Sequence, residues 1–293
     1  MARGRRCHYG SPFPPCDPLP RAAVTAQSPD AFPPVERLDG DTACGILVLC
    51  DHASNALPPE YGTLGLDPSQ LERHIGYDIG AAAVTRGLAR RLGAPALLTT
   101  YSRLLIDPNR GDDDPTLIMR LSDGAVVPAN ARHTAEEREA RIARFHRPYH
   151  AAIKAELDRM EALGLVPLIV SIHSFTPVWR GTPRPWHVGM LWDTDPRAAI
   201  MMIRAFERDP ALVVGDNEPY DGALRNDTLY VHGSARGFPH VLVEVRQDLI
   251  ADDAGAEAWA ARLEPITREL RADPEMGTVR RYGSRAGALP VDA

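Results

Sequence analysis

The sequence has almost no lysine, an acidic balance of charge and no long apolar run. Lys154 is the only lysine, and the arginines are scattered along the chain rather than clustered. The net charge of -6 argues against a general nucleic-acid binder, because binding to phosphates needs a basic surface. No run of apolar residues approaches the ~20 that are needed to cross a bilayer. We therefore expect neither a nucleic-acid partner nor a membrane partner.

Cysteines are few, and their spacing forms no recognisable metal or disulfide pattern. The four cysteines (Cys7, Cys16, Cys44 and Cys50) include no CxxC pair, and a disulfide framework is not expected in a chain of this size. The basic N-terminus lacks the apolar segment of a secretory signal. These features predict a cytoplasmic protein. A content of 44% hydrophobic and 25% charged residues is typical of a globular chain with a sizeable core.

The composition predicts one domain between two loose ends. Residues 1–38 carry eight prolines and little apolar periodicity, so we interpret them as a disordered or loosely packed leader. Residues 284–293 are interpreted as a flexible tail. Between them there is no repeat, no low-complexity linker and no sharp change in composition. Residues 39–283 are therefore predicted to form a single domain.

Within that domain, short apolar runs alternate with helical patterns. Strands are predicted at Ile46–Cys50, Ala96–Thr100, Arg103–Ile106, Leu168–Ile172, Val188–Trp192 and Val241–Val245. Helices are predicted at Asp78–Leu92, from a capping box at Thr134 and Glu137 to about Met160 with a kink at Pro148, at Asp195–Arg208 and at Ala254–Arg271. Alternating strands and helices indicate an α/β domain, with a largely parallel sheet between two layers of helices.

Chemically useful side chains follow the predicted strands. The first strand ends at Asp51 and His52, "LIVSIHSFTP" ends at His173, and "VLVEVRQDL" places Glu244 between valines. In parallel sheets, ligands bind beyond the carboxyl ends of the strands. Two histidines and a carboxylate are residue types of catalytic zinc sites. The alternatives are hydrogen-bonded structural histidines and an ion pair between Glu244 and Arg246.

Three further segments offer candidates for the same site. Asp78 stands where a helix is predicted to begin, as an N-cap or as a third metal ligand, and His74 is a competing ligand. "YSRLLIDPNR" gathers Arg103, Asn109 and Arg110, which suit the capture of a carboxylate or, alternatively, a salt-bridge network. Arg184 lies in "RGTPRPWHVG", interpreted as a loop over the site. No Walker A, GxGxxG, GxSxG or HExxH motif occurs.

Seven segments together resemble the N-formylglutamate amidohydrolase family, a distant relative of zinc carboxypeptidases and aspartoacylases. They are "DHASNALP", "HIGYDIGAA", "YSRLLIDPNR", "SIHSFTPVWRG", "RPWHVG", "DNEPY" and "VEVRQDLI", which occur in this order between about residues 45 and 250. The resemblance implies a single three-layer α/β domain with a mixed sheet. It also implies a zinc-dependent hydrolase, with another divalent metal as an alternative, and an association with amino-acid metabolism.

The resemblance also assigns roles to individual residues. His52 and His173 match the metal-binding histidines, Glu244 matches the general base, and Arg103, Asn109 and Arg110 resemble the polar set that holds a substrate carboxylate. Arg103 is also expected to stabilise the oxyanion, and Arg184 and Arg246 are expected to contact substrate. The carboxypeptidase relatives use a His-x-x-Glu pair, whereas position 55 is Asn here. Asp78 is therefore our candidate third ligand, with His74 and Asn55 as alternatives.

These features predict a hydrolase that cleaves the amide of N-formyl-L-glutamate or a related small N-acyl amino acid. One rival is the same centre acting on a different acyl group or a peptide. The other is a non-catalytic protein that binds a metal or a carboxylate on the same fold. An intact set of His52, His173 and Glu244 favours the enzyme, because a binding protein has no need of a base.

Overall fold

A seven-stranded sheet forms the centre of the computed structural model, which describes Met1 and residues 32–289. Its strand order is β1-β3-β2-β6-β11-β9-β10. Neighbouring strands are parallel, except that β1 is antiparallel to β3 and β9 is antiparallel to β11. The bounds are β1 (Val35–Leu38), β2 (Ile46–Cys50), β3 (Ala96–Thr99), β6 (Leu168–Phe175), β9 (Val188–Leu191), β10 (Val214–Asp216) and β11 (His240–Arg246). The predicted mixed, mostly parallel sheet is confirmed.

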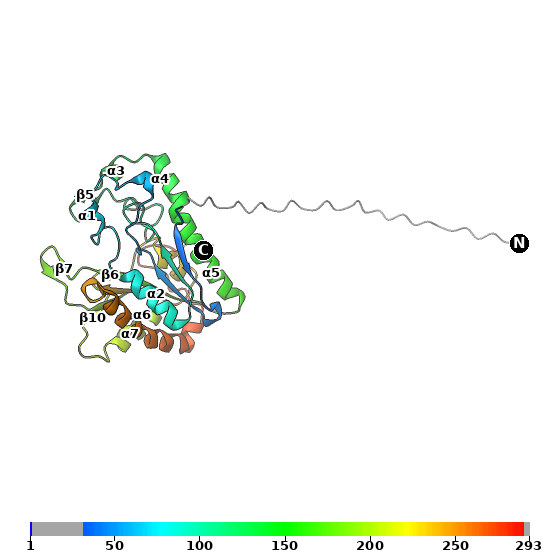
Figure 1. Ribbon diagram of the computed structural model, residues 1–293. Helices are drawn as coiled ribbons and strands as arrows, with labels where there is room; N and C mark the ends of the chain where they lie inside the picture. The colour runs from blue at the N-terminus through cyan, green and yellow to red at the C-terminus, as the bar shows by residue number, and fades with distance from the viewer. Residues whose placement is uncertain (2–31, 290–293) are drawn as a thin grey trace. The chain divides into compact units, whose positions relative to one another are not determined.

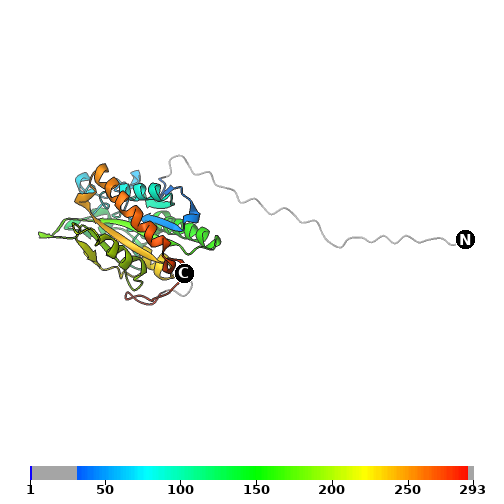
Figure 2. The same ribbon diagram turned by 90° about the horizontal axis from the view of Figure 1, so that it is seen from below.

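Helices cover both faces of this sheet (Figure 1). The helices are α1 (Pro68–Leu71), α2 (Ala81–Leu92), α3 (Pro128–Ala131), α4 (Ala135–Arg141), α5 (Arg147–Ala162), α6 (Arg197–Phe206) and α7 (Asp253–Ala272). α2, α6 and α7 pack on one face, and Figure 2 shows α7 lying between the other two. α5 packs on the opposite face. The sheet and its two covering layers of helices form a three-layer α/β arrangement.

The alternation of side chains along the central strands explains why helices are needed on both faces. In β2, Val48 and Cys50 pack with α2, whereas Leu47 and Leu49 pack with α5, and all five residues of the strand are buried. β6 is buried along its whole length as well. A parallel sheet of this kind has no face left for water, so its strands are apolar at nearly every position.

Helix ends follow the capping signals in the sequence. The Thr134 side chain accepts a hydrogen bond from the Glu137 N–H at 3.2 Å at the start of α4, as the capping box predicts. α2 ends at Gly93, whose φ of 67° lies in the left-handed region that glycine adopts without strain. These local signals place helix ends within one to three residues of the predicted positions.

One predicted strand is wrong, and one predicted helix is less regular than expected. Arg103–Ile106 is not a strand but a series of turns, in which the Ser102 hydroxyl accepts a bond from Leu104 N and donates one to Gly76 O. The predicted long helix runs without a break from Ala135 to Ala162, but a π-helical stretch, Ile142–His146, lies between α4 and α5. Pro148 follows this stretch and has no N–H to donate to the turn before it.

Several elements lie outside the predicted set. The last four residues of the predicted leader form β1 at the sheet edge, and residues 2–31 of that leader lie outside the described residues. β10 was not predicted, because only three residues of "ALVVGDN" pair with β9. Two short hairpins stand between strands of the sheet along the chain. They are β4 (Leu121–Ser122) with β5 (Ala125–Val126), and β7 (Val178–Trp179) with β8 (Thr182–Pro183). Among residues 32–289, no helix is both long and apolar enough to span a membrane.

Candidate metal centre and active site

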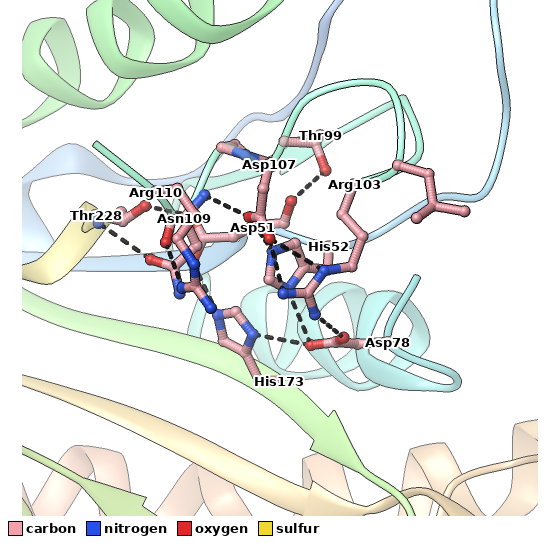
Figure 3. A network of polar contacts seen from close by, with 12 residues as sticks. Asp51, His52, Asp78, Thr99, Arg103, Asp107, Asn109, Arg110, His173 and Thr228 are labelled. Atoms are coloured by element: carbon pink, nitrogen blue, oxygen red, sulfur yellow. Dashed lines mark hydrogen bonds and ion pairs between the residues drawn. The ribbon is translucent and has the colours of Figure 1, made fainter. Parts of the chain in front are cut away.

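Two histidines and one aspartate converge where β2 and β6 end (Figure 3). His52 lies two residues after the end of β2, His173 belongs to β6, and Asp78 precedes α2; all three are buried. His52 Nδ1 and His173 Nδ1 lie 3.3 and 2.8 Å from Asp78 Oδ2. One ligand atom from each residue lies within 4.8 Å of the other two. Atoms that bind one zinc ion at about 2 Å lie roughly 3–3.5 Å apart, so these three atoms fit a single divalent cation.

The second nitrogen of each ring is held by a carboxylate. His52 Nε2 lies 2.6 Å from Asp107 Oδ1, and His173 Nε2 lies 2.9 Å from Asp51 Oδ2. With a metal bound, each ring would donate Nε2–H to its carboxylate and present the lone pair of Nδ1 to the ion. This carboxylate–histidine arrangement is typical of metal sites, where it fixes the tautomer and raises the basicity of the ligand. The donor set therefore fits a divalent metal ion.

The carboxylate of Asp51 is held by hydrogen bonds at both oxygens. Its Oδ1 accepts hydrogen bonds from Tyr149 and Thr228, and its Oδ2 accepts bonds from Ser171 and His173. Burial by itself would raise the pKa of Asp51, but the hydrogen bonds and the charge of His173 lower it well below its usual range. Asp51 therefore stays ionised in the interior and holds His173 in a fixed orientation.

The sequence analysis missed the roles of Asp51 and Asp107. Asp51 stands next to His52 in the chain but bonds the other histidine, so adjacency alone suggests the wrong partner. Asp107 is sandwiched between His52 and Arg103, whose Nη2 lies 2.7 Å from Asp107 Oδ2. The sequence offered one signal for these roles: an aspartate in each of the segments "DHASNALP" and "YSRLLIDPNR".

His173 lies between two carboxylates and carries a charge that depends on them. Burial lowers the pKa of His173, but the bonds to Asp51 and Asp78 outweigh burial and raise the pKa well above the ordinary value. Without a metal, the ring is therefore a cation at neutral pH. A divalent cation held at the same place would supply positive charge to the same two carboxylates and would displace this proton.

Glu244 lies directly across from His173, because the register of β6 and β11 pairs these two residues. It is buried, and its Oε2 has no hydrogen-bond partner among residues 32–289. Burial raises the pKa of Glu244 to about 7, against the opposing charge of His173. A buried carboxyl that takes up and releases a proton near neutral pH beside a metal site has the properties of a general base.

Replacement of Glu244 by Gln is expected to stabilise the metal-free protein at alkaline pH. A carboxyl with a raised pKa favours folding below about pH 4.5 and loses that contribution as the pH rises to about 7. Gln does not titrate, so the variant should exceed the wild type by up to about 3 kcal/mol at pH 8 and by little at pH 5. Urea unfolding with a chelator at both pH values measures this difference.

The matched control is Glu207→Gln, at an exposed position after α6. It should change the unfolding free energy equally little at pH 5 and pH 8. An unfolding free energy of Glu244→Gln that follows the wild type at both pH values contradicts the prediction.

Arg103, Asn109 and Arg110 line the same cavity as the two histidines. The Arg103 guanidinium is held by Asp107 and lies 3.4 Å from Asp78 Oδ1. Asn109 Oδ1 accepts a bond from Thr228 N at 3.1 Å, so its Nδ2 donors remain available. Arg110 Nη1 donates to Asn109 O, and Arg110 forms no ion pair among the described residues. Asn109 and Arg110 thus present free donors of the kind that bind a carboxylate.

Two further histidines hydrogen-bond the loop that contains Asn109 and Arg110. His146 Nε2 and His150 Nε2 lie 2.9 and 3.0 Å from the carbonyl oxygens of Arg110 and Pro108. Burial, together with the neighbouring His146, lowers the pKa of His150 to about 4. The ring is therefore neutral at physiological pH and donates Nε2–H to the loop. The sequence analysis assigned His146 and His150 no role, because a histidine on a helix gives no sign of which loop it contacts.

A cavity of about 350 Å³ opens beside these groups. This volume lies within the range of small-molecule sites, ~300–1,000 Å³. The predicted site residues that line the cavity are His52, Asp78, Arg103, Asn109, Arg110, His173 and Glu244. The cavity therefore joins the candidate metal ligands, the candidate base and the candidate carboxylate-binding donors in one space.

The remaining candidates are engaged elsewhere. Arg184 stacks on Tyr220 and donates to its hydroxyl, and Arg246 pairs with Asp248; neither arginine lines the cavity. Of the alternative third ligands, His74 lies 3.4 Å from Asp123 Oδ2. Asn55 donates to Leu71 O. Of the three candidates only Asp78 meets both histidines.

Comparisons with known proteins agree with this architecture. A family model described as N-formylglutamate amidohydrolase matches residues 44–251. An N-formylglutamate deformylase of Pseudomonas putida is 34% identical over 97 residues, a match that spans 29% of this chain and only 36% of that enzyme.

Two solved structures share the fold. The structure of a gene product of Agrobacterium tumefaciens is 32% identical with a TM-score of 0.78, over 83% of this chain and 97% of that one. The structure of the N-formylglutamate amidohydrolase of Ralstonia eutropha is 20% identical with a TM-score of 0.62, over 82% of this chain and 97% of that one. At that identity the second comparison concerns the fold alone.

Proposed function

The chain belongs to the N-formylglutamate amidohydrolase family, and we propose that it is a metal-dependent hydrolase of N-formyl-L-glutamate or a related N-acyl amino acid. The products are a carboxylate and a free amino acid. The observation that carries this proposal is the meeting of His52, Asp78 and His173 beside the buried, unpartnered Glu244. A protein that only binds a metal or a carboxylate gains nothing from a base kept in that position.

His52, Asp78 and His173 would hold the metal, and zinc suits their two nitrogens and one oxygen. A bound zinc ion supplies a Lewis acid that polarises the amide carbonyl and makes a water molecule more acidic. Asp51 and Asp107 fix the two rings through Nε2. Another divalent metal is the alternative, and metal analysis of the purified protein distinguishes zinc from it.

The proton transfers fall to Glu244. Its carboxylate accepts the proton of the attacking water and then returns that proton to the nitrogen of the leaving amino acid, so the same oxygen serves in both halves of the reaction. A pKa of about 7 suits both steps at neutral pH. Arg103 lies at the metal side of the cavity, where its guanidinium would stabilise the negative charge that develops on the carbonyl oxygen.

Substrate binding falls to Asn109 and Arg110. The Nδ2 group of Asn109 and the guanidinium of Arg110, which forms no ion pair within residues 32–289, would hold the α-carboxylate of the amino acid and so fix the amide between the metal ligands and Glu244. Arg184 and Arg246 are not included in this proposal, because neither arginine lines the cavity.

The test is metal analysis of the purified protein with an assay for formate release. We expect close to one divalent ion per chain, loss of hydrolysis of N-formyl amino acids after removal of the metal, and recovery on addition of zinc. Parallel additions of manganese, cobalt and magnesium identify the preferred metal. Full turnover by protein shown to be metal-free contradicts metal dependence. A metal-loaded protein that hydrolyses no N-acyl amino acid supports the binding protein instead.

A further inference from the structure

The cavity extends well past the metal ligands along one face of β11. His240, Leu242 and Glu244 are alternate residues of this strand, so their side chains point to the same face, and all three line the cavity. Alternate residues of a strand are about 6.5–7 Å apart. The floor of the cavity therefore runs from the base at Glu244, past Leu242, to His240 about 13 Å away.

The middle of this floor is apolar. Leu242 pairs directly with Leu191 of β9, and both leucines line the cavity. Leu229, which precedes the π-helical stretch Tyr230–Ser234, lines it as well. All three leucines belong to the hydrophobic cluster that also contains Phe238. A ligand group about 7 Å from Glu244 along the strand therefore meets leucine side chains rather than water or charge.

The charges around the cavity provide for one substrate carboxylate. Its lining contains two arginines, and Arg103 is already paired with Asp78 and Asp107. Arg110 alone of the two has no ion pair among the described residues. The lining also contains the carboxyl group of Asp227 and the leucines, and no further arginine or lysine among the described residues. The second carboxylate of a glutamate derivative would be buried there without a cation, which is unfavourable.

We propose that the preferred substrate carries a single carboxylate, held by Arg110 and Asn109, and an aliphatic group that lies over Leu242 between Leu191 and Leu229. This inference rests on the proposed function and narrows its substrate class. Two sources supply the aliphatic group: the side chain of an N-formyl amino acid such as N-formyl-L-leucine, or the acyl chain of a substrate such as N-hexanoylglycine. The assay separates these two sources.

The experiment compares kcat/KM of the zinc-loaded full chain for four amides: N-formyl-L-leucine, N-hexanoylglycine, N-formylglycine and N-formyl-L-glutamate. We expect one of the first two to exceed N-formylglycine by roughly 10–100-fold, because burial of an aliphatic group of this size is worth that factor. We expect the same substrate to exceed N-formyl-L-glutamate by at least about tenfold. The one that leads identifies the side of the amide that carries the aliphatic group.

A variant that adds the missing cation tests the same idea from the protein side. Leu229→Arg should shift the preference toward N-formyl-L-glutamate, and Leu224→Arg, at a half-buried position in the cavity lining, serves if Leu229→Arg does not fold. The control Leu163→Arg, at an exposed position after α5, should leave the ratio of the two substrates unchanged.

The outcomes distinguish the two levels of the proposal. Equal or higher kcat/KM for N-formyl-L-glutamate overturns the aliphatic preference while the proposed function stands. Absence of hydrolysis for all four amides by the metal-loaded protein overturns the proposed function, and the substrate preference that depends on it is then overturned too.

Discussion

Glu244→Gln is expected to lower kcat by about 10²–10⁴-fold while the protein keeps its metal. Gln has nearly the shape of Glu but cannot accept the proton of the attacking water. Because Glu244 is not among the three candidate metal ligands, the metal content should stay at the wild-type value. Since Glu244 is also not among the groups proposed to hold the carboxylate, KM should change much less than kcat. Steady-state kinetics and metal analysis of the same preparation measure both effects.

The control for this variant is Glu207→Gln, which makes the same chemical change at an exposed position. It should retain wild-type kcat. A kcat of Glu244→Gln within a few-fold of wild type contradicts the role of Glu244 as base, and loss of metal from this variant would instead make Glu244 part of the metal site.

The same carboxyl group explains why an inactivating change can stabilise the fold. Burial that raises the pKa of Glu244 to about 7 makes it useful as a base, and the same burial costs folding free energy at alkaline pH. Loss of turnover and gain of stability in one variant would separate a catalytic carboxylate from one that is retained for an ion pair.

His173→Ala is expected to remove the metal and with it essentially all turnover. The substitution deletes one of the three converging ligand atoms. It also removes the His173 ring that bonds both Asp51 and Asp78. The metal content after gel filtration should fall to a small fraction of the wild-type value. Mass spectrometry of the metal gives this content, and circular dichroism shows whether the chain remains folded.

A graded variant keeps this prediction testable if His173→Ala unfolds. Asp51→Asn retains both histidines but weakens the bond that orients His173, so metal affinity should fall by about 10–100-fold. His187→Ala, a histidine just before β9 and outside the candidate triad, should retain wild-type affinity. Full metal binding by both His173→Ala and Asp51→Asn contradicts the assignment of the centre.

The sequence by itself predicted the layers of the fold and the convergence of His52, His173 and Glu244. The reason is physical: apolar runs reveal buried strands, and in a parallel sheet residues at the ends of separate strands lie at one edge. The register of β6 and β11, which places Glu244 opposite His173, is consistent with that expectation. Residues fixed by their position along a strand could therefore be placed before any coordinates were known.

Only the tertiary structure decided which polar groups work together. Asp51 bonds His173 rather than its neighbour His52, Asp78 rather than His74 meets both histidines, and Arg184 turns to Tyr220. Each choice depends on the direction of a side chain in a loop or at a strand end, and contacts with residues distant in sequence set that direction. The leucine-lined floor of the cavity could not be predicted for the same reason. A leucine in a strand pattern indicates a buried core position, and only the structure shows the cavity beside it.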